Sequence, residues 1–144
     1  NVSEKKLSRR ITEPQATIDV GDEILSMIHD DELVTKKGPV FQTAIIAGVM
    51  GAKRTSELIP FCHPLSLEDC QVKIRVEKKM ILIESRTIVT SKTGVEMEAL
   101  TAASVAALTV YDMCKAISHN IIIRDIKLMA KSGGKNDFKR TKKL

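Results

Sequence analysis

Residues 95–117, with the sequence VEMEALTAASVAALTVYDMCKAI, decide the fold that we expect for this chain. Apolar side chains recur around the whole circumference of a helix drawn through this segment, which is typical of a long helix buried on all sides. The charged residues of the segment are Glu96, Glu98, Asp112 and Lys115. Because a charge on a buried helix is costly unless it is paired or used, each of the four needs an explanation.

Four other segments have the character of strands. They are residues 14–20, 68–76, 80–89 and 121–130. Two further helices are predicted between the first and second of these strands: a short one capped by Asp22, and one that Gly38-Pro39 opens and that runs to about residue 58. The order β-α-α-β-β-α-β predicts an α+β fold, a ferredoxin-like antiparallel four-stranded sheet with helices on one face and an additional N-terminal helix.

The second predicted helix contains two interior glycines, Gly48 and Gly51. Each costs roughly 1 kcal/mol of helix stability relative to Ala. The glycines therefore indicate that another backbone or a ligand lies close to this helix, and a packed helix is the simpler explanation.

The length of 144 residues, with 43% apolar and 28% charged residues, fits one soluble globular domain. We expect residues 1–144 to form a single ferredoxin-like domain with a flexible N-terminal segment, residues 1–13, and a basic C-terminal tail, residues 132–144. Residues 131–144 hold six Lys and Arg against one acid, Asp137, whereas residues 1–130 are formally neutral. Because nucleic-acid binding needs phosphate neutralisation across a surface, a basic tail does not favour a nucleic-acid partner.

The sequence predicts a cytoplasmic protein without a membrane partner. Residues 1–10 are polar and basic, unlike a signal peptide, and the longest uncharged run, residues 38–52, is shorter than the ~20 residues that span a bilayer. The three cysteines, Cys62, Cys70 and Cys114, form no CxxC pair and predict neither a disulfide framework nor a zinc site.

Two of the four charges on the long helix lie at its start. Thr93-Gly94-Val95-Glu96 matches a capping box, in which Thr93 is the N-cap and Glu96 bonds back to its amide. Glu98 falls outside that pattern, so it is the better candidate for a functional carboxylate.

The other two charges, Asp112 and Lys115, are i, i+3 neighbours on one face of the helix. On a surface such a pair adds a few tenths of a kcal/mol, but on an apolar helix it can serve proton transfer, which we favour. Glu98 and Asp112 are 14 residues apart, about 21 Å along a helix. If both serve one site, two subunits must build that site.

Several residues elsewhere could bind an anion. His63, in Phe61-Cys62-His63-Pro64, is either a hydrogen-bonded loop residue or a ligand-binding one. Lys131-Ser132-Gly133-Gly134-Lys135 follows a strand, and its glycines would let backbone amides approach a phosphate, although the spacing is not that of a P-loop. The remaining cations of interest would form a polyphosphate pocket if they converged. They are Arg9, Arg10, Lys37, Lys53 and Arg54.

Five segments together resemble the cyclic pyranopterin monophosphate synthase family, the C protein of molybdenum cofactor biosynthesis. They are Ala52-Lys53-Arg54-Thr55, Ile59-Pro60-Phe61-Cys62-His63-Pro64-Leu65, Lys92-Thr93-Gly94-Val95-Glu96-Met97-Glu98-Ala99-Leu100-Thr101, Tyr111-Asp112-Met113-Cys114-Lys115 and Ala130-Lys131-Ser132-Gly133-Gly134-Lys135. These segments occur in the family's order and cover nearly the whole chain. The resemblance implies a ferredoxin-like subunit, a homohexamer built as a trimer of dimers, and an active site between subunits.

The resemblance also implies the reaction, which rearranges 3′,8-cyclo-7,8-dihydroguanosine 5′-triphosphate to cyclic pyranopterin monophosphate and releases pyrophosphate, as a phosphorus-oxygen lyase does. By position, Asp112 corresponds to the catalytic acid/base residue and Lys115 to its partner. The substrate-binding residues implied in the same way are Phe61, Cys62, His63, Glu96, Met97 and Glu98, with Lys37, Lys53, Lys131 and Arg10 as the cations that hold the triphosphate. No cofactor is implied, although Mg²⁺ could accompany the triphosphate.

Two positions depart from the family's pattern: Pro39 stands where Asp is usual, and Phe61 stands where Leu is usual. The competing interpretation is a ferredoxin-like RNA- or nucleotide-binding module without catalysis. Such a module would stack bases on aromatic residues of its sheet. The four aromatic residues of the chain, Phe41, Phe61, Tyr111 and Phe138, all fall outside the predicted strands.

Overall fold

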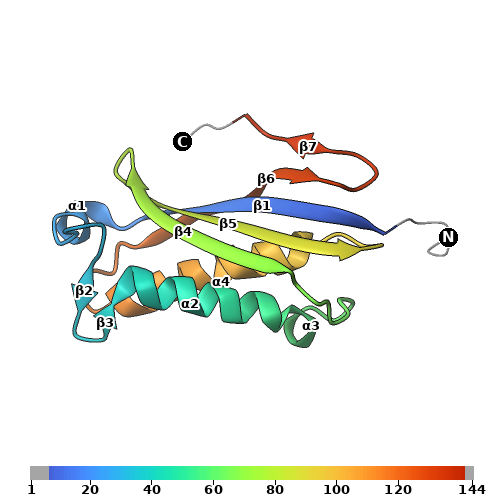
Figure 1. The fold of residues 1–144 in the computed structure, drawn as a ribbon. Helices are drawn as coiled ribbons and strands as arrows, with labels where there is room; N and C mark the ends of the chain where they lie inside the picture. The colour runs from blue at the N-terminus through green and yellow to red at the C-terminus, as the bar shows by residue number, and fades with distance from the viewer. Residues whose placement is uncertain (1–6, 142–144) are drawn as a thin grey trace.

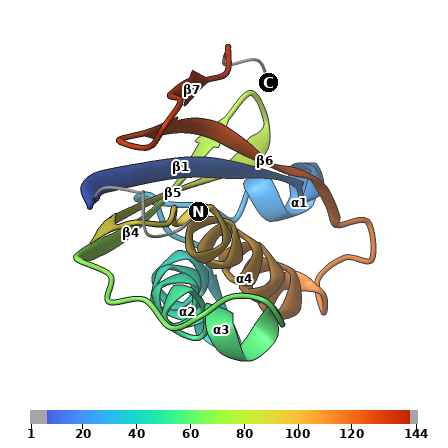
Figure 2. The same ribbon diagram turned by 90° about the vertical axis from the view of Figure 1, so that its right-hand side faces the viewer.

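The computed structural model describes residues 7–141. Its main sheet is antiparallel and has the strand order β4-β5-β1-β6-β7. The strands are β1 (Ser8–Asp19), β4 (Asp69–Glu77), β5 (Met80–Ser91), β6 (Ile122–Ser132) and β7 (Phe138–Lys139). The two long helices, α2 (Val40–Lys53) and α4 (Glu96–Cys114), cover one face of this sheet (Figures 1 and 2). The α+β, ferredoxin-like class is therefore confirmed.

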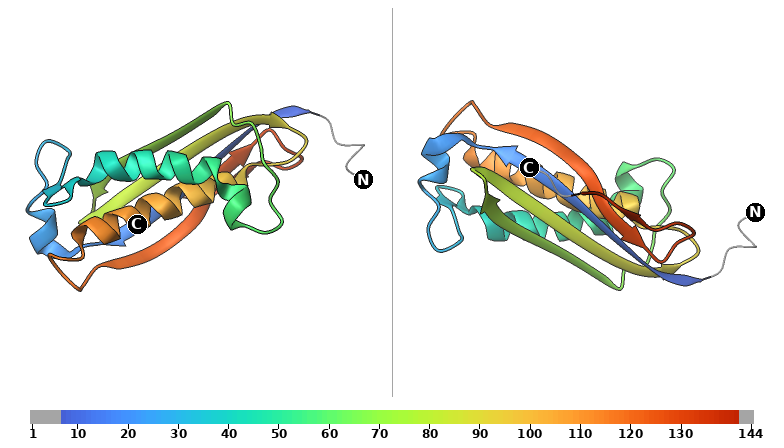
Figure 3. Two further views of the ribbon diagram at one scale, coloured as in Figure 1. Left: turned by 90° about the horizontal axis from the view of Figure 1, so that it is seen from below. Right: turned by 90° about the horizontal axis from the view of Figure 1, so that it is seen from above.

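Four short elements lie at the two ends of this helical layer. Helix α1 (Gly21–Leu25) and the two-stranded ribbon of β2 (Val34–Thr35) and β3 (Gly38–Pro39) lie at one end, where α2 begins. Helix α3 (Thr55–Leu58) lies at the other end, where α2 stops. Helices α2 and α4 run side by side in opposite directions (Figure 3), so the end of α4 lies near the start of α2.

The interior glycines of α2 are explained by the close approach of α4. A Cβ added to Gly48 would lie 2.8 Å from the carbonyl oxygen of Ala102, and one added to Gly51 would lie 2.8 Å from Cγ2 of Val105. The prediction of a packed helix beside these glycines is confirmed. Alanines of α4 complete the contact from the other side, where Ala102, Ala103 and Ala106 are fully buried.

The sequence predicted that the long helix is buried on all sides, and this prediction is wrong for α4 in the single chain. Its alanine-rich face packs on the sheet and on α2, but Leu108 is 60% exposed and Tyr111 is 38% exposed. On α2, Ile46 and Met50 are also about half exposed. The helical layer of a single chain therefore presents apolar side chains on the side away from the sheet. Among the described residues, no helix is long and apolar enough to cross a membrane.

The structure corrects several boundaries. Strand β1 begins at Ser8, so residues 8–13 are paired with β5 and β6 rather than flexible; residues 1–6 lie outside the described residues. The expected tail contributes a fifth strand, because Phe138 and Lys139 form β7 beside β6. The helix predicted up to residue 58 is divided into α2 and α3. The N-cap of α1 is Val20 rather than Asp22, and the amide of Gly21 donates to Asp19 Oδ1 at 3.2 Å.

Candidate active site

Three side chains from two distant segments meet at the C-terminal end of α4, and we call them the aspartate cluster. Lys115 Nζ lies 3.0 Å from Asp112 Oδ1, and Lys37 Nζ lies 3.1 Å from Asp112 Oδ2. Lys37 Nζ also donates to the backbone carbonyl of Asp112 at 3.2 Å. Hydrogen bonds from Lys115 and then Lys37 favour the charged carboxylate, so the pKa of Asp112 is lowered from its ordinary value.

The aspartate cluster is more exposed than the sequence suggested. The side chains of Lys37, Asp112 and Lys115 are each about half exposed. In the single chain, therefore, the carboxylate and its two ammonium groups face solvent rather than an apolar interior. Their ion pairs are those of a surface, where such contacts add little to stability.

Lys37 reaches Asp112 because the β2–β3 ribbon is held against the start of α2. The carboxylate of Glu32 accepts hydrogen bonds from the amides of Phe41 (2.7 Å) and Gln42 (3.1 Å), which are free donors in the first turn of the helix. Pro39 is the N-cap residue and offers no side-chain hydrogen bond. Glu32 thus supplies the cap that an Asp at position 39 would otherwise provide.

A second group of predicted residues meets at the opposite end of α4, around a cavity of about 170 Å³. We call it the Cys–His cavity. Its wall contains six of the predicted substrate-binding residues, Phe61, Cys62, His63, Glu96, Met97 and Glu98. Glu98 is only 5% exposed, and burial followed by the charge of Glu96 raises its pKa. Burial and the charge of Glu98 likewise raise the pKa of Cys62, so this thiol is neutral at pH 7 and is not an activated nucleophile.

A second cavity, of about 230 Å³, adjoins the first, and we call it the basic cavity. Three cations line it: Arg10, Lys131 and Lys135. Gly94 and Glu96 line both cavities, so the two are neighbours that share a wall. Lys131 Nζ lies 3.8 Å from Glu96 Oε1 at that shared wall.

The capping box predicted at the start of α4 is wrong. Val95 is the N-cap residue and no side chain caps the helix. The amide of Thr93 donates instead to Ser91 Oγ at 3.2 Å, and Glu96 turns toward Lys131. Glu96 consequently lines the cavities and does not cap the helix.

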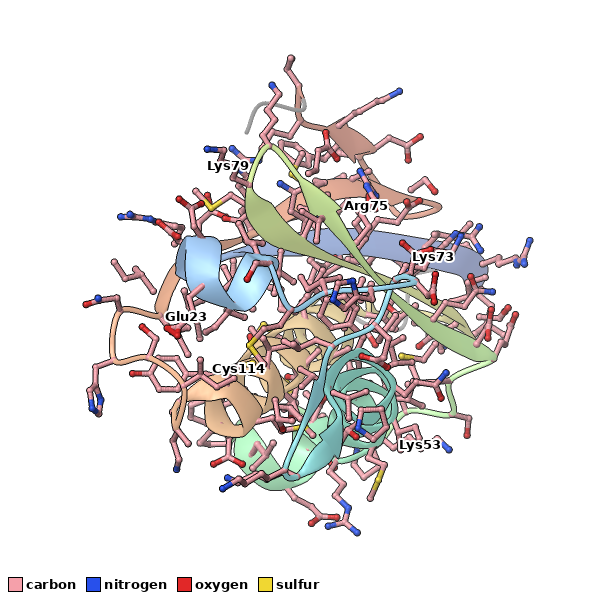
Figure 4. All side chains as sticks on the ribbon, turned by 90° about the vertical axis from the view of Figure 1, so that its left-hand side faces the viewer. Glu23, Lys53, Lys73, Arg75, Lys79 and Cys114 are labelled. Atoms are coloured by element: carbon pink, nitrogen blue, oxygen red, sulfur yellow. The ribbon has the colours of Figure 1, made fainter. Side chains whose placement is uncertain are left out.

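Of the predicted cations, Lys53 belongs neither to the basic cavity nor to the aspartate cluster. It lies on the side of α2 turned away from α4 (Figure 4) and does not line either cavity. Its charge acts on Cys70, where it opposes the effects of burial and of Asp69, which together raise the pKa of that thiol to about 11. Within residues 7–141, no three His, Cys, Asp or Glu side chains gather closely enough to hold a metal ion.

The predicted site residues are thus divided between the two ends of one helix. Arg10, Lys131, Glu96 and the residues of the Cys–His cavity lie at the start of α4, whereas the aspartate cluster lies at its end. Glu98 and Asp112 both fall within the continuous α4, so they are about 21 Å apart along its axis. One small molecule cannot contact both groups of a single chain.

Two residues that line or support these groups were not predicted individually as site residues. Lys135 lies in the glycine-containing segment singled out in the sequence, but nothing there showed that its side chain shares a cavity with Arg10. Glu32 gave no signal at all, because the amides that it binds are 9 and 10 residues further along the chain.

The fold and the placement of ionisable residues define a ferredoxin-like α+β protein with charged clusters at both ends of its central helix. The sequence profile of the MoaC family matches residues 1–134, and the chain belongs to that family. It is 49% identical over 142 residues, 97% of its length, to molybdenum cofactor biosynthesis protein 1 of Drosophila melanogaster, and 39% identical over 153 aligned residues, 94% of its length, to the protein of the same name from Dictyostelium discoideum. The aligned regions are 25% and 24% of those two proteins, so the chain spans about a quarter of the length of the curated relatives it matches.

Proposed function

We propose that this chain acts in molybdenum cofactor biosynthesis as a cyclic pyranopterin monophosphate synthase. Membership of the MoaC family and the names of the two relatives support that pathway. The observation that carries the proposal is the shared wall of the two cavities, formed by Gly94 and Glu96. A cavity with polar and apolar groups suits a purine-derived ring system, and the adjoining cations suit its triphosphate.

In the proposed reaction the basic cavity orients a substrate that carries about four negative charges. The pyrophosphate leaves as the cyclic phosphate closes: a substrate hydroxyl forms the new P–O bond to the α-phosphorus, and the bond from that phosphorus to the β-phosphate oxygen breaks. The hydroxyl proton needs an acceptor, and Asp112 with Lys115 supplies the proton-transfer pair. Any Mg²⁺ would arrive with the triphosphate as part of the substrate.

The proposed active site is built by two copies of the chain. Two α4 helices that pass each other in opposite directions would bring the aspartate cluster of one copy to the cavities of the other, which removes the separation of about 21 Å. The exposed apolar residues of the helical layer, Ile46, Met50, Leu108 and Tyr111, offer a surface for that contact. A homohexamer made of three such dimers is the assembly that the family resemblance implies.

The proposal is tested by following turnover of the cyclised guanosine triphosphate, with released pyrophosphate converted to phosphate by pyrophosphatase. Asp112→Asn and Lys115→Ala should each lower kcat by at least about 100-fold, the contribution of a positioned acid or base, without changing the circular dichroism spectrum. Lys73→Ala is the matched control, because Lys73 lies on β4, on the face of the sheet away from the helices (Figure 4). Full activity in both cluster variants would contradict the proposed roles.

The same assay separates the synthase from an RNA-binding module. Of the four aromatic residues, Phe138 alone lies in a strand, the two-residue β7, which corrects its predicted position outside the strands. One aromatic at the sheet edge is a poor stacking platform. Absence of turnover together with tighter binding of single-stranded RNA than of a guanine triphosphate would favour the module.

A further inference from the structure

The basic cavity contains a lysine, Lys135, to which the family resemblance assigns no role. Lys135 lines this cavity together with Arg10 and Lys131. Lys131 has a carboxylate partner, Glu96, at 3.8 Å. Lys135 is exposed, and among the described residues no carboxylate forms an ion pair with it. Its charge is therefore uncompensated at the edge of a cavity already suited to anions.

Contacts of the backbone at Gly133 fix the position of the loop that carries Lys135. Gly133 has a φ of +87°, and a Cβ at this position would lie 1.8 Å from the carbonyl oxygen of Arg9. The loop is therefore seated directly on β1, which only glycine allows. Ser8 Oγ donates to the carbonyl of Gly133 at 2.6 Å, and the amide of Gly133 donates to Asp137 Oδ1 at 3.2 Å. That amide is already used, so the N–H of Gly133 is not available to an incoming phosphate.

Arg10 is fixed in the same place by the strand beside it. Its Nε and Nη2 atoms donate to the carbonyls of Ser91 and Lys92, each at 3.0 Å. Its Nη1 atom faces Gly134, because a Cβ added there would lie 2.8 Å from it. The free edge of the guanidinium and the chain segment that leads to Lys135 thus lie together on one wall.

The order of the cations along the cavity assigns them to different phosphates. Lys131 pairs with Glu96 at the wall shared with the Cys–His cavity, so it lies at the junction. Lys131 and Lys135 both line the basic cavity and neither lines the Cys–His cavity, but of these two lysines only Lys131 is paired with a residue of the shared wall. We propose that Lys135 binds the terminal phosphate of the substrate and makes the site select triphosphates over shorter phosphate chains. This inference rests on the proposed function for the identity of the ligand.

The test uses inorganic tripolyphosphate, pyrophosphate and orthophosphate as probes, titrated by calorimetry into the full chain at one fixed salt concentration. We expect Lys135→Ala to weaken tripolyphosphate binding by about tenfold, as the loss of one charge-assisted contact should, and to leave orthophosphate binding unchanged. Lys135→Arg should retain the preference for tripolyphosphate. Lys73→Ala removes the same charge from the opposite face of the sheet and should change neither affinity.

Equal tripolyphosphate affinities for Lys135→Ala and the unmodified chain would overturn the inference. So would an unmodified chain that binds tripolyphosphate no more tightly than orthophosphate. The probes contain no purine and undergo no rearrangement, so the result is independent of synthase activity. Lys135-dependent binding without turnover would preserve this inference and remove the proposed function, whereas turnover with Lys135-independent binding would do the reverse.

Discussion

The carboxylate of Asp112 lies between two ammonium groups from different parts of the chain. Lys115 is three residues further along, at the C-cap of α4, and Lys37 lies in the β2–β3 ribbon. Both donate hydrogen bonds to the charged form, which lowers the pKa of Asp112. In the proposed synthase, a substrate phosphate that attracted one of the lysines would remove a hydrogen-bond partner from the carboxylate and make it a stronger base. Phosphate binding would in this way be coupled to proton transfer.

The first prediction concerns Lys37. Lys37→Ala removes one of the two hydrogen bonds that favour the carboxylate, so the pKa of Asp112 should rise toward its ordinary value of 3.8. An NMR titration of the carboxylate carbon measures this directly. The neighbouring Lys36→Ala is the control, since Lys36 is an exposed lysine of the same ribbon, and it should leave the titration unchanged. An unshifted pKa in Lys37→Ala would show that the contact does not persist in solution.

The second prediction concerns Glu98, whose pKa is raised by burial and by Glu96. At pH values between the ordinary pKa of 4.5 and the raised pKa of Glu98, the folded chain binds the carboxyl proton of Glu98 more tightly than the unfolded chain does. The free energy of unfolding therefore falls as the pH rises through this range. Glu98→Gln removes the effect. Urea denaturation at pH 4 and pH 7.5 should therefore show the unmodified chain losing stability relative to Glu98→Gln as pH rises. A difference between the two proteins that is independent of pH would contradict this account.

At the residue scale the sequence predicted which residues lie at the two ends of α4 better than it predicted how exposed their side chains are. Glu98 was expected to be buried and is, because its neighbours along α4 are alanines packed in the core. Asp112 lies on the same helix and Lys115 directly follows it, yet both side chains are about half exposed, as are those of Leu108 and Tyr111 nearby. Sequence periodicity alone does not distinguish a helix covered by its own chain from one that leaves an apolar side open.

At the scale of elements, Glu32 connects the segment before β2 to the start of α2. Through this connection the β2–β3 ribbon is held where Lys37 reaches Asp112. The carboxylate of Glu32 satisfies two first-turn amides of α2 and also accepts from the amide of Leu33 at 2.8 Å. A negative charge at a helix N-terminus is favourable as well because of the helix dipole. The ribbon that carries Lys37 is anchored through this residue.

The third prediction is that Glu32→Ala lowers the free energy of unfolding by about 1–2 kcal/mol, the usual effect of removing a helix cap. Because the ribbon loses its anchor, the same variant should also raise the pKa of Asp112, as Lys37→Ala does. Denaturant unfolding and the carboxylate titration measure the two effects. Glu23→Ala, an exposed acid in the first turn of α1 (Figure 4), should change stability by less than about 0.5 kcal/mol. A Glu32 variant as stable as this control would refute the capping role.

The long elements were predictable and the short ones were not. Strands β4 and β5 and helix α4 follow from alternation and helical periodicity sustained over many residues. Strand β7 has two residues and exists because Gly133 allows the chain to turn back on β6. The cap of α4 was predicted wrongly because Ser91 and Lys131, which bind Thr93 and Glu96, come from other elements.

For the whole molecule, the central claim is that one chain carries two complementary halves of an active site. The basic cavity lies where β1, β6 and the start of α4 meet, and the Cys–His cavity lies between the segment after α3 and the start of α4. The aspartate cluster lies at the opposite end of the helical layer (Figure 1). The exposed apolar side chains of α2 and α4 lie on the helical layer, which spans the distance between these ends. A two-fold axis near the middle of α4 would place each half beside its complement and cover that apolar surface at the same time.

Subunit complementation tests this claim most directly. Asp112→Asn damages the cluster and Arg10→Ala damages the cavity, so each protein alone should be inactive. When equal amounts are unfolded and refolded together, half of the dimers are mixed, and each mixed dimer contains one site assembled from two undamaged halves. Turnover of the cyclised guanosine triphosphate should then return to about a quarter of the unmodified rate, by random pairing. Turnover that stays at the level of the separate variants would mean that each chain builds its site alone, which contradicts the account.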